Sequence, residues 1–266
     1  MTTARILIIA GSDSGGGAGI QADIKTVTLL GGHAMTAITA LTAQNTLGVA
    51  AVHPVPAEMV IAQIDAVADD IGVDAVKIGM IGNAAIAEQV ADRLDRPDLA
   101  DVPLVFDPVM IATSGSRLAD SATIAAFGRL MRRAAVSTPN LDELGALSGR
   151  ALGDEPAVAV AAAGLIAEGS GPILATGGGF VAGQLTDLLF TAASEAEERR
   201  WTAGWIDTIH DHGTGCTLAS AIATGLGQGL ALADAITRAR AFVRAALLAA
   251  PGLGRGHGPM GHRSID

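Results

Sequence analysis

The feature that most constrains the fold is the alternation of short β-branched apolar runs with longer segments of helical periodicity. The first apolar run is Arg5–Ala10, and a helical pattern follows at Ile20–Leu30, where Gly31 and Gly32 stop it. Strands that alternate with helices in this way form mostly parallel sheets, because each helix returns the chain to the same end of the sheet. The pattern therefore predicts an α/β fold with a mostly parallel central sheet and helices on both faces.

The same alternation continues to the end of the chain. The expected further strands are His33–Gln44, Ala51–Val55, Ala75–Ile78, Leu104–Phe106, Ala135–Ser137, Ile173–Ala175 and Leu185–Phe190. The expected further helices are Ala57–Ile71, Ala84–Leu94, Ala122–Met131, one from Leu141, Pro156–Glu168 and a last long one on which Ile236, Ala239, Val243 and Leu247 share a face. No low-complexity linker or internal repeat interrupts the pattern, so residues 1–266 are expected to form a single domain.

Composition and charge exclude several classes of partner. The net charge of −10 and an aromatic content of 3% argue against a nucleic-acid-binding protein. The run from Gly213 to Ala233 has no charged residue over 21 positions, but its five glycines indicate a buried core helix and not a membrane span. One cysteine permits no internal disulfide, so a cytoplasmic protein is expected.

The segment His212–Thr217, of sequence HGTGCT, runs into an apolar helical pattern. Glycines at a helix start leave backbone N–H groups bare, and the helix dipole adds partial positive charge, so this segment suits an anion. Cys216 would lie in the same field, which favours its thiolate. Gly213, Thr214, Gly215 and Cys216 therefore indicate phosphoryl-transfer chemistry.

A second glycine-rich segment, Gly11–Gly19, lies between the first strand and the first helix, where open α/β sheets bind ligands. It matches neither the dinucleotide fingerprint nor the Walker A motif. Substrate binding is favoured over a plain tight turn, because four glycines in five positions exceed what a turn requires. Asp23, one turn into the helix, either faces the ligand or is an exposed acid.

Polar residues also follow three later strands. Asp107 is placed to bind Mg²⁺ or an attacking hydroxyl, or to cap the next segment. Asn140 and Glu143 could hold a hydrated Mg²⁺, but their spacing alone favours a helix-capping pair. Thr176–Gly179 is interpreted equally as a phosphate contact or a hairpin turn. His210–His212 is expected to be a polar loop, and 254–259 a loop over one edge of the fold.

In this order, these segments resemble the ribokinase superfamily, and within it the hydroxymethylpyrimidine/phosphomethylpyrimidine kinases of thiamine biosynthesis. The matching stretches cover nearly the whole chain; they are Ala10–Asp23, Thr42–Thr46, Lys77–Met80, Asp107–Met110, Thr138–Glu143, His212–Thr217 and Gly256–Pro259. The resemblance implies ATP-dependent phosphorylation of a hydroxymethylpyrimidine and then of its monophosphate, by a homodimer.

The resemblance also implies roles for single residues. Gln44 would pair with the ring nitrogen and exocyclic amine of the pyrimidine. Cys216 would be the base beside the attacking hydroxyl, with the N–H groups of Gly213 to Cys216 stabilising the transferred phosphoryl group. The other implied substrate-binding residues are Gly11, Ala18, Asp23, Met80 and Val109; Asp107, Asn140, Thr176, Gly178 and Thr214 would contact ATP, and Asp107, Asn140 and Glu143 would organise Mg²⁺.

One departure from the family pattern concerns the ATP phosphates. Thr176 stands where the family usually carries a lysine, and Gly179 where a histidine is common. Thr176 keeps open the alternative of a non-catalytic pyrimidine-binding sensor. A pyridoxal kinase is a second alternative, because pyridoxal is a similar flat heterocycle that bears a hydroxymethyl group. Gly11–Gly19 and Ala112–Arg117 are the segments expected to close over a substrate.

Overall fold

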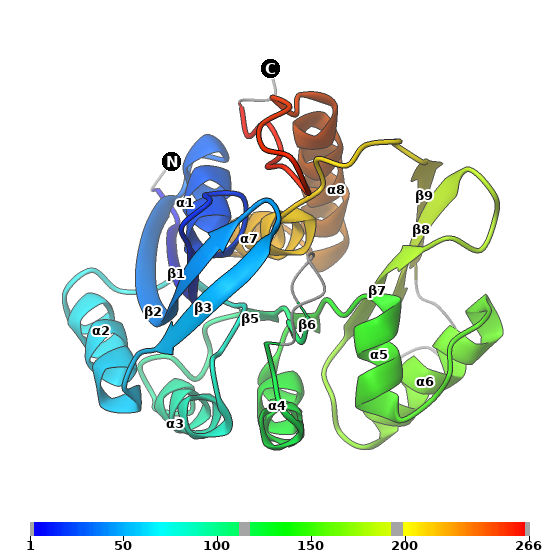
Figure 1. Cartoon of the computed structure of the whole chain (residues 1–266). Helices are drawn as coiled ribbons and strands as arrows, with labels where there is room; N and C mark the ends of the chain where they lie inside the picture. Colours follow the sequence, from blue (N-terminus) through cyan, green and yellow to red (C-terminus); the bar gives the residue numbers. More distant parts are fainter. Residues whose placement is uncertain (1–2, 112–117, 193–198, 264–266) are drawn as a thin grey trace.

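The structure, a computed structural model, describes residues 3–111, 118–192 and 199–263, and one nine-stranded sheet runs through this part of the chain (Figure 1). The strands are β1 (Arg5–Asp13), β2 (His33–Asn45), β3 (Gly48–Pro54), β4 (Ala75–Ile78), β5 (Leu104–Phe106), β6 (Val136–Ser137), β7 (Ile173–Gly178), β8 (Gln184–Phe190) and β9 (Arg199–Gly204). The helices are α1 (Gly19–Leu29), α2 (Ala57–Asp70), α3 (Ala84–Leu94), α4 (Ser121–Arg133), α5 (Leu141–Ser148), α6 (Glu155–Ala167), α7 (Thr214–Gly227) and α8 (Leu232–Leu248).

The centre of the sheet is parallel and its edges are antiparallel. The strand order is β3-β2-β1-β4-β5-β6-β7-β8-β9, and the pairs from β2 to β7 are all parallel. Hairpins add β3 at one edge and β8 and β9 at the other, because short connections join only antiparallel strands. The prediction of a mostly parallel sheet is confirmed.

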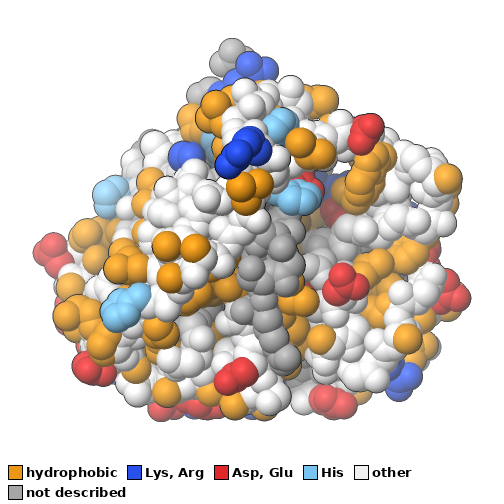
Figure 2. All heavy atoms as spheres, viewed as in Figure 1, with side chains coloured by type: hydrophobic (Ala, Val, Ile, Leu, Met, Phe, Trp, Pro, Cys, Tyr) orange, Lys and Arg blue, Asp and Glu red, His pale blue; other side chains and the backbone are white. Residues whose placement is uncertain are grey.

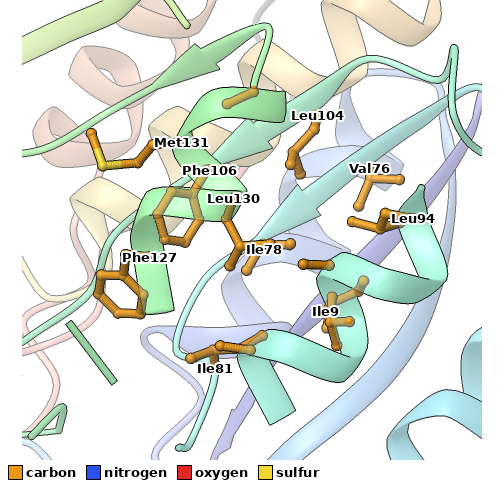
Figure 3. Packing of buried hydrophobic residues seen from close by; sticks show 14 of the residues in the cluster. Ile9, Val76, Ile78, Ile81, Leu94, Leu104, Phe106, Phe127, Leu130 and Met131 are labelled. Carbon is orange, nitrogen blue, oxygen red and sulfur yellow. The ribbon is translucent and has the colours of Figure 1, made fainter. Parts of the chain in front are cut away.

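Helices cover both faces of the sheet, as predicted. On β1, Leu7 and Ile9 point into a core shared with α2 to α6, whereas Ile6 and Ile8 point into a core shared with α1, α7 and α8. Figure 3 shows part of the first core, in which Ile9 lies among side chains of the neighbouring strands and helices. The Phe106 and Phe127 rings meet edge to face with centroids 5.1 Å apart, a favoured aromatic geometry.

The uncharged run beginning at Gly213 forms α7, whose residues Thr217 to Gly225 are all buried. Its glycines allow close packing: a Cβ at Gly227 would lie 2.7 Å from Ile6 Cδ1. The run is therefore a core helix, as predicted. Within the described residues, no helix has both the length and the apolar character that a membrane crossing needs.

Two features of the sheet differ from the sequence prediction. Strand β1 continues beyond Ala10 to Asp13, because Ser12 and Asp13 pair with Leu41 and Thr42 after a bulge. Strand β9 was not predicted; it pairs with β8 at the open edge and is mostly exposed, so it lacks the apolar run that marks a buried strand.

Candidate active site

A cavity of about 490 Å³ opens at the carboxyl end of the parallel strands, the place where open α/β sheets bind ligands. The surface is hollowed on the side shown in Figure 2. Most of the predicted site residues line this cavity: Gly11, Ala18, Gln44, Met80, Asp107, Val109, Asn140, Glu143, Thr176, Gly213, Thr214, Gly215 and Cys216. The structure therefore brings together residues from the ends of six strands, β1, β2, β4, β5, β6 and β7, and from the start of α7.

The first turn of α7 forms one end of the cavity. Gly213 precedes it with φ of 90°, and a Cβ there would lie 2.0 Å from the Gly17 carbonyl oxygen, so only glycine fits. The first backbone N–H groups of a helix have no intrahelical partner, and here they belong to residues that line the cavity. This end of the cavity offers the partial positive charge that the sequence predicted.

The environment of Cys216 differs from the expectation. Burial raises the pKa of its thiol to about 12; the nearby Lys77 ammonium and the Gly19 N–H lower it, but do not compensate. The carboxylates of Asp23 and Asp107 raise it further. The thiol pKa is thus raised and not lowered, against the expectation that the field of the helix favours a thiolate, and the main cause is loss of solvation.

Two carboxyl groups, those of Asp107 and Glu143, lie on the wall of the cavity. Burial raises the pKa of Asp107 to about 6, and burial together with the charge of Asp107 raises the pKa of Glu143 to about 8. Oδ2 of Asp107 is buried and has no hydrogen-bond partner among the described residues. Repelling carboxylates with a spare oxygen fit a divalent cation, which would relieve both effects.

Asn140 and Glu143 form the helix cap that their spacing favours. Asn140 Oδ1 accepts from the Glu143 N–H at 2.9 Å, and the Glu143 carboxylate accepts from the Asn140 N–H at 3.0 Å. In the described part of the chain, no three His, Cys, Asp or Glu side chains converge as a metal-binding group. An ion here would therefore take several ligands from water and phosphate, as Mg²⁺ usually does.

The glycine-rich segment is built around a residue that the sequence analysis missed. The Asp13 carboxylate accepts hydrogen bonds from the backbone N–H groups of Gly15, Gly17 and Ala18 at 2.8–2.9 Å. Gly19 has φ of 56°, and a Cβ there would lie 2.4 Å from the Gly11 carbonyl oxygen. The segment is thus a tight turn and also a wall of the cavity.

Asp23 does not line the cavity. Both its side chain and that of Lys77 are fully buried, and their charged atoms are 2.9 Å apart. The Ser220 hydroxyl donates to the same carboxylate at 2.6 Å. Neither sequence interpretation of Asp23 is correct: it joins α1, β4 and α7 and is neither a ligand contact nor an exposed acid.

A second cavity of about 290 Å³ adjoins the first. Asn140, Thr176, Thr214 and Gly215 line both, so the two meet at the start of α7. Its outer wall carries apolar side chains, Trp205, Ile206, Val243 and Leu247, and two cations, Arg240 and Arg244. The sequence analysis did not find this cavity, since its walls come from β8, β9 and α8, which are far apart in the sequence.

Around Thr176 the chain is strand and not hairpin turn, because β7 continues to Gly178. The Thr176 hydroxyl lies 3.3 Å from the Pro139 carbonyl, and the Gly177 N–H donates to Asp187, which also pairs with Arg240. Gly178 lines neither cavity: it is buried, and a Cβ there would lie 2.2 Å from the Phe180 ring. Of the two residues proposed for this strand, only Thr176 is placed to meet a ligand.

His212 lies in the loop that leads into α7, as predicted, but it is buried there and is part of the site. It is 8% exposed, lines the larger cavity, and its Nε2 lies within 3.2 Å of both Gln44 and Asp13. Its backbone N–H donates to the Gly258 carbonyl, so the C-terminal segment supports it. Its position directly before the Gly213 motif was the only signal in the sequence. The predicted mobile loop Ala112–Arg117 lies outside the described residues.

Comparisons with known proteins agree with this geometry. Residues 13–261 match the family model described as phosphomethylpyrimidine kinase. A hydroxymethylpyrimidine/phosphomethylpyrimidine kinase of Rhizobium meliloti is 47% identical over 264 residues, covering 98% of this chain and 97% of that protein. A thiamine biosynthesis bifunctional protein of Geobacter sulfurreducens is 45% identical over 97% of this chain, which spans 52% of that protein. An ADP complex of Bacillus subtilis pyridoxal kinase superposes with a TM-score of 0.84 at 33% identity, covering 98% of both chains.

Proposed function

The chain belongs to the phosphomethylpyrimidine kinase family, and from this premise we propose the reaction that its two cavities carry out. The enzyme transfers a phosphoryl group from ATP to the hydroxymethyl group of 4-amino-5-hydroxymethyl-2-methylpyrimidine, and then phosphorylates the monophosphate, in thiamine biosynthesis. The observation that carries this proposal is the junction of the cavities at Thr214 and Gly215, where a phosphoryl group would pass between them.

The larger cavity is the pyrimidine site. Gln44 presents a carboxamide to it, which can both donate to a ring nitrogen and accept from an exocyclic amine. Met80 and Val109 supply apolar walls for a flat ring, and Gly11 and Ala18 leave room for it. A Cβ at Gly11 would lie 3.2 Å from the Met80 sulfur, so a larger residue would crowd this wall.

The second cavity is the nucleotide site. Trp205, Ile206 and Leu247 offer apolar surface to an adenine, and Asn140, Thr176 and Thr214 stand at the end that faces the first cavity. Arg240 is the cation that compensates for Thr176 in the place of the family lysine. Its guanidinium is held by Asp187, whose carboxylate also accepts from the N–H of Gly177, next to Thr176.

Cys216 is the base in this proposal. The substrate oxygen attacks the γ-phosphorus, the bond from that phosphorus to the bridging oxygen of ADP breaks, and the hydroxyl proton passes to the Cys216 thiolate. Gly213 to Cys216 donate backbone N–H groups to the transferred phosphoryl group. Because the thiol is protonated in the resting protein, the rate depends on the small thiolate fraction.

Magnesium would be held by Asp107 and by the Asn140–Glu143 pair, directly or through water. When bound, the ion neutralises charge on the nucleotide phosphates. Among the described residues Asp107 Oδ2 has no hydrogen-bond partner, and the raised pKa values of both carboxyl groups support a site that a cation would stabilise. We further propose a cytoplasmic homodimer that binds only these small molecules, with neither nucleic acid nor membrane as a partner; the exposed apolar side chains of β2 and β3 support the dimer.

The test is ADP release from purified protein with Mg²⁺-ATP and either the aminopyrimidine or pyridoxal. Turnover with the pyrimidine is expected. Turnover with pyridoxal alone would make the chain a pyridoxal kinase, the activity of its Bacillus subtilis neighbour. Pyrimidine binding without ADP release would favour the sensor.

A further inference from the structure

The carboxamide of Gln44 is held at both ends where it faces the larger cavity. In the structure its Nε2 lies 2.8 Å from Nε2 of His212, and its Oε1 lies 3.3 Å from Oγ1 of Thr42. Ser14 fixes the backbone, because its hydroxyl donates to the Gln44 carbonyl at 2.7 Å and accepts from the Gln44 N–H at 2.8 Å. A half-turn exchanges the amide nitrogen and oxygen at almost no cost in shape, so the partners decide which atom lies where.

Where the Gln44 carboxamide meets the imidazole, His212 is the hydrogen-bond donor. Nε2 of His212 lies 3.2 Å from Oδ2 of Asp13. Burial by itself would raise the pKa of Asp13, but hydrogen bonds from His212, Ala18 and Gly15 outweigh it and lower the pKa below its usual value. An ionised carboxylate only accepts, so Nε2 carries a proton in the neutral and in the charged ring alike. That single N–H is shared between Asp13 at 3.2 Å and Gln44 at 2.8 Å, so it requires an oxygen from Gln44 as well.

At the opposite end of the Gln44 carboxamide, the Thr42 hydroxyl is the hydrogen-bond acceptor. The Thr42 hydroxyl has one proton, and it donates this proton to the Ser12 carbonyl at 2.9 Å. Its longer contact, at 3.3 Å, is with Gln44, and only lone pairs are left for it. The hydroxyl therefore requires an N–H from the carboxamide, which agrees with the requirement of His212.

We propose that His212 and Thr42 hold the Gln44 carboxamide in the half-turned orientation, with Oε1 against the imidazole and Nε2 against the hydroxyl, and that this orientation determines which heterocycle the site accepts. This inference rests on the proposed pyrimidine site. One lone pair of Oε1 and one N–H of Nε2 then remain for the ligand. They match an edge on which an amine stands beside an unprotonated ring nitrogen.

The orientation also excludes a ligand of the same shape. A 4-oxo analogue of the pyrimidine, 5-hydroxymethyl-2-methylpyrimidin-4-one, presents a carbonyl oxygen in place of the amine and a ring N–H in place of the ring nitrogen. In the same pose, oxygen would face oxygen and N–H would face N–H. A carboxamide free to rotate would accept both ligands, whereas one held by His212 and Thr42 accepts only the amine.

The imidazole is itself prevented from moving aside. A Cβ on Gly17 would lie 2.7 Å from Cδ2 of His212, so the glycine backbone packs closely against the ring. The His212 N–H donates to the Gly258 carbonyl at 3.2 Å, and the side chain is 8% exposed. His212 is thus a positioning residue that acts through Gln44.

The test compares the dissociation constants of the two pyrimidines, measured by calorimetry without nucleotide. In the wild type we expect the amine to bind about 100-fold more tightly than the oxo analogue, the cost of leaving buried polar groups unpaired. His212→Met removes the donor and should reduce this ratio to below about tenfold. His212→Gln places an amide N–H near the position of Nε2 and should retain the ratio.

Thr42→Val tests the other end of the carboxamide without altering the glycine-rich segment, and it should reduce the ratio as His212→Met does. Thr42→Ser keeps the hydroxyl and is its matched control. A ratio that is unchanged in His212→Met and Thr42→Val, or near one in the wild type, overturns the inference and leaves the kinase proposal intact. Failure of the wild type to bind either pyrimidine overturns the proposed function itself.

Discussion

Thr176, which stands where the family resemblance implies a lysine, lies where the two cavities meet. A lysine there would add a positive charge beside the nucleotide phosphates. We expect Thr176→Lys to raise kcat/KM for ATP by about tenfold, equivalent to about 1.4 kcal/mol of transition-state stabilisation. Thr176→Met is the control, because methionine is similar in length to lysine but carries no charge. Initial rates at varied ATP measure the effect, and an unchanged or lower kcat/KM for ATP would contradict it.

The raised pKa of the Cys216 thiol predicts how kcat depends on pH. With a thiol pKa of about 12, the thiolate fraction rises tenfold for each pH unit through the neutral range. If Cys216 is the base, kcat should rise from pH 6 towards pH 9 without a plateau. Cys216→Ala should lower kcat by about 10²–10⁴-fold and flatten the profile, while the pyrimidine dissociation constant changes little. A loss below tenfold would reduce Cys216 to a lining residue.

At the scale of elements, the Asp23–Lys77 pair holds α1 against β4. Lys77→Met leaves a buried carboxylate without its counter-charge, and removing one partner of such a pair costs about 3–5 kcal/mol. Urea unfolding should show this loss in the free energy of unfolding. Adding Asp23→Asn should restore at least half of it, because the introduced carboxamide is neutral and can still accept from the Ser220 hydroxyl. If Lys77→Met lowers the free energy of unfolding by less than about 1 kcal/mol, the structural role assigned to the buried Asp23–Lys77 pair is contradicted.

The capping pair at the start of α5 couples stability to pH. The pKa of Glu143 is about 8 in the folded protein against an ordinary 4.5, so the folded state binds more protons between these values. Rising pH must therefore destabilise the ligand-free protein across this window. We expect the Tm to fall by roughly 5 °C or more from pH 5 to pH 8, and Glu143→Gln to reduce that fall. If the Tm of the wild type and that of Glu143→Gln change with pH in the same way, the raised pKa of the buried Glu143 is contradicted.

At the scale of the whole molecule, the sequence predicted what periodicity and local motifs determine. Alternating apolar runs predicted the sheet and both helical layers, and the motif at Gly213 predicted the anion end of the cavity. Contacts between distant segments were not predictable. Asp23 was misplaced because its partner, Lys77, is 54 residues away, and His212 was missed because Asp13 is 199 residues away.

The second cavity was missed for the same reason. Asn140, Thr176 and Thr214 carry recognisable motifs, but their other neighbours come from β8, β9 and α8. Those elements contribute isolated side chains such as Trp205 and Arg240, without a motif that sequence inspection detects. The thiol of Cys216 illustrates a related limit, because its pKa depends on burial, which a single sequence does not give.

The edge of the sheet at β3 bears on how the molecule assembles. Strand β3 is exposed along almost its whole length and has one side unpaired, while Leu41 of β2 and Val52 of β3 are 49% and 43% exposed. Open edges with apolar side chains are sites of association, so a second copy of this chain is the proposed partner.

Sedimentation velocity should give about twice the monomer mass of 26.6 kDa. Leu41→Glu would bury a carboxylate in each copy and should shift the protein to 26.6 kDa, whereas Leu41→Met should remain a dimer. A wild type that sediments as a monomer at micromolar concentration would exclude this edge as a stable interface.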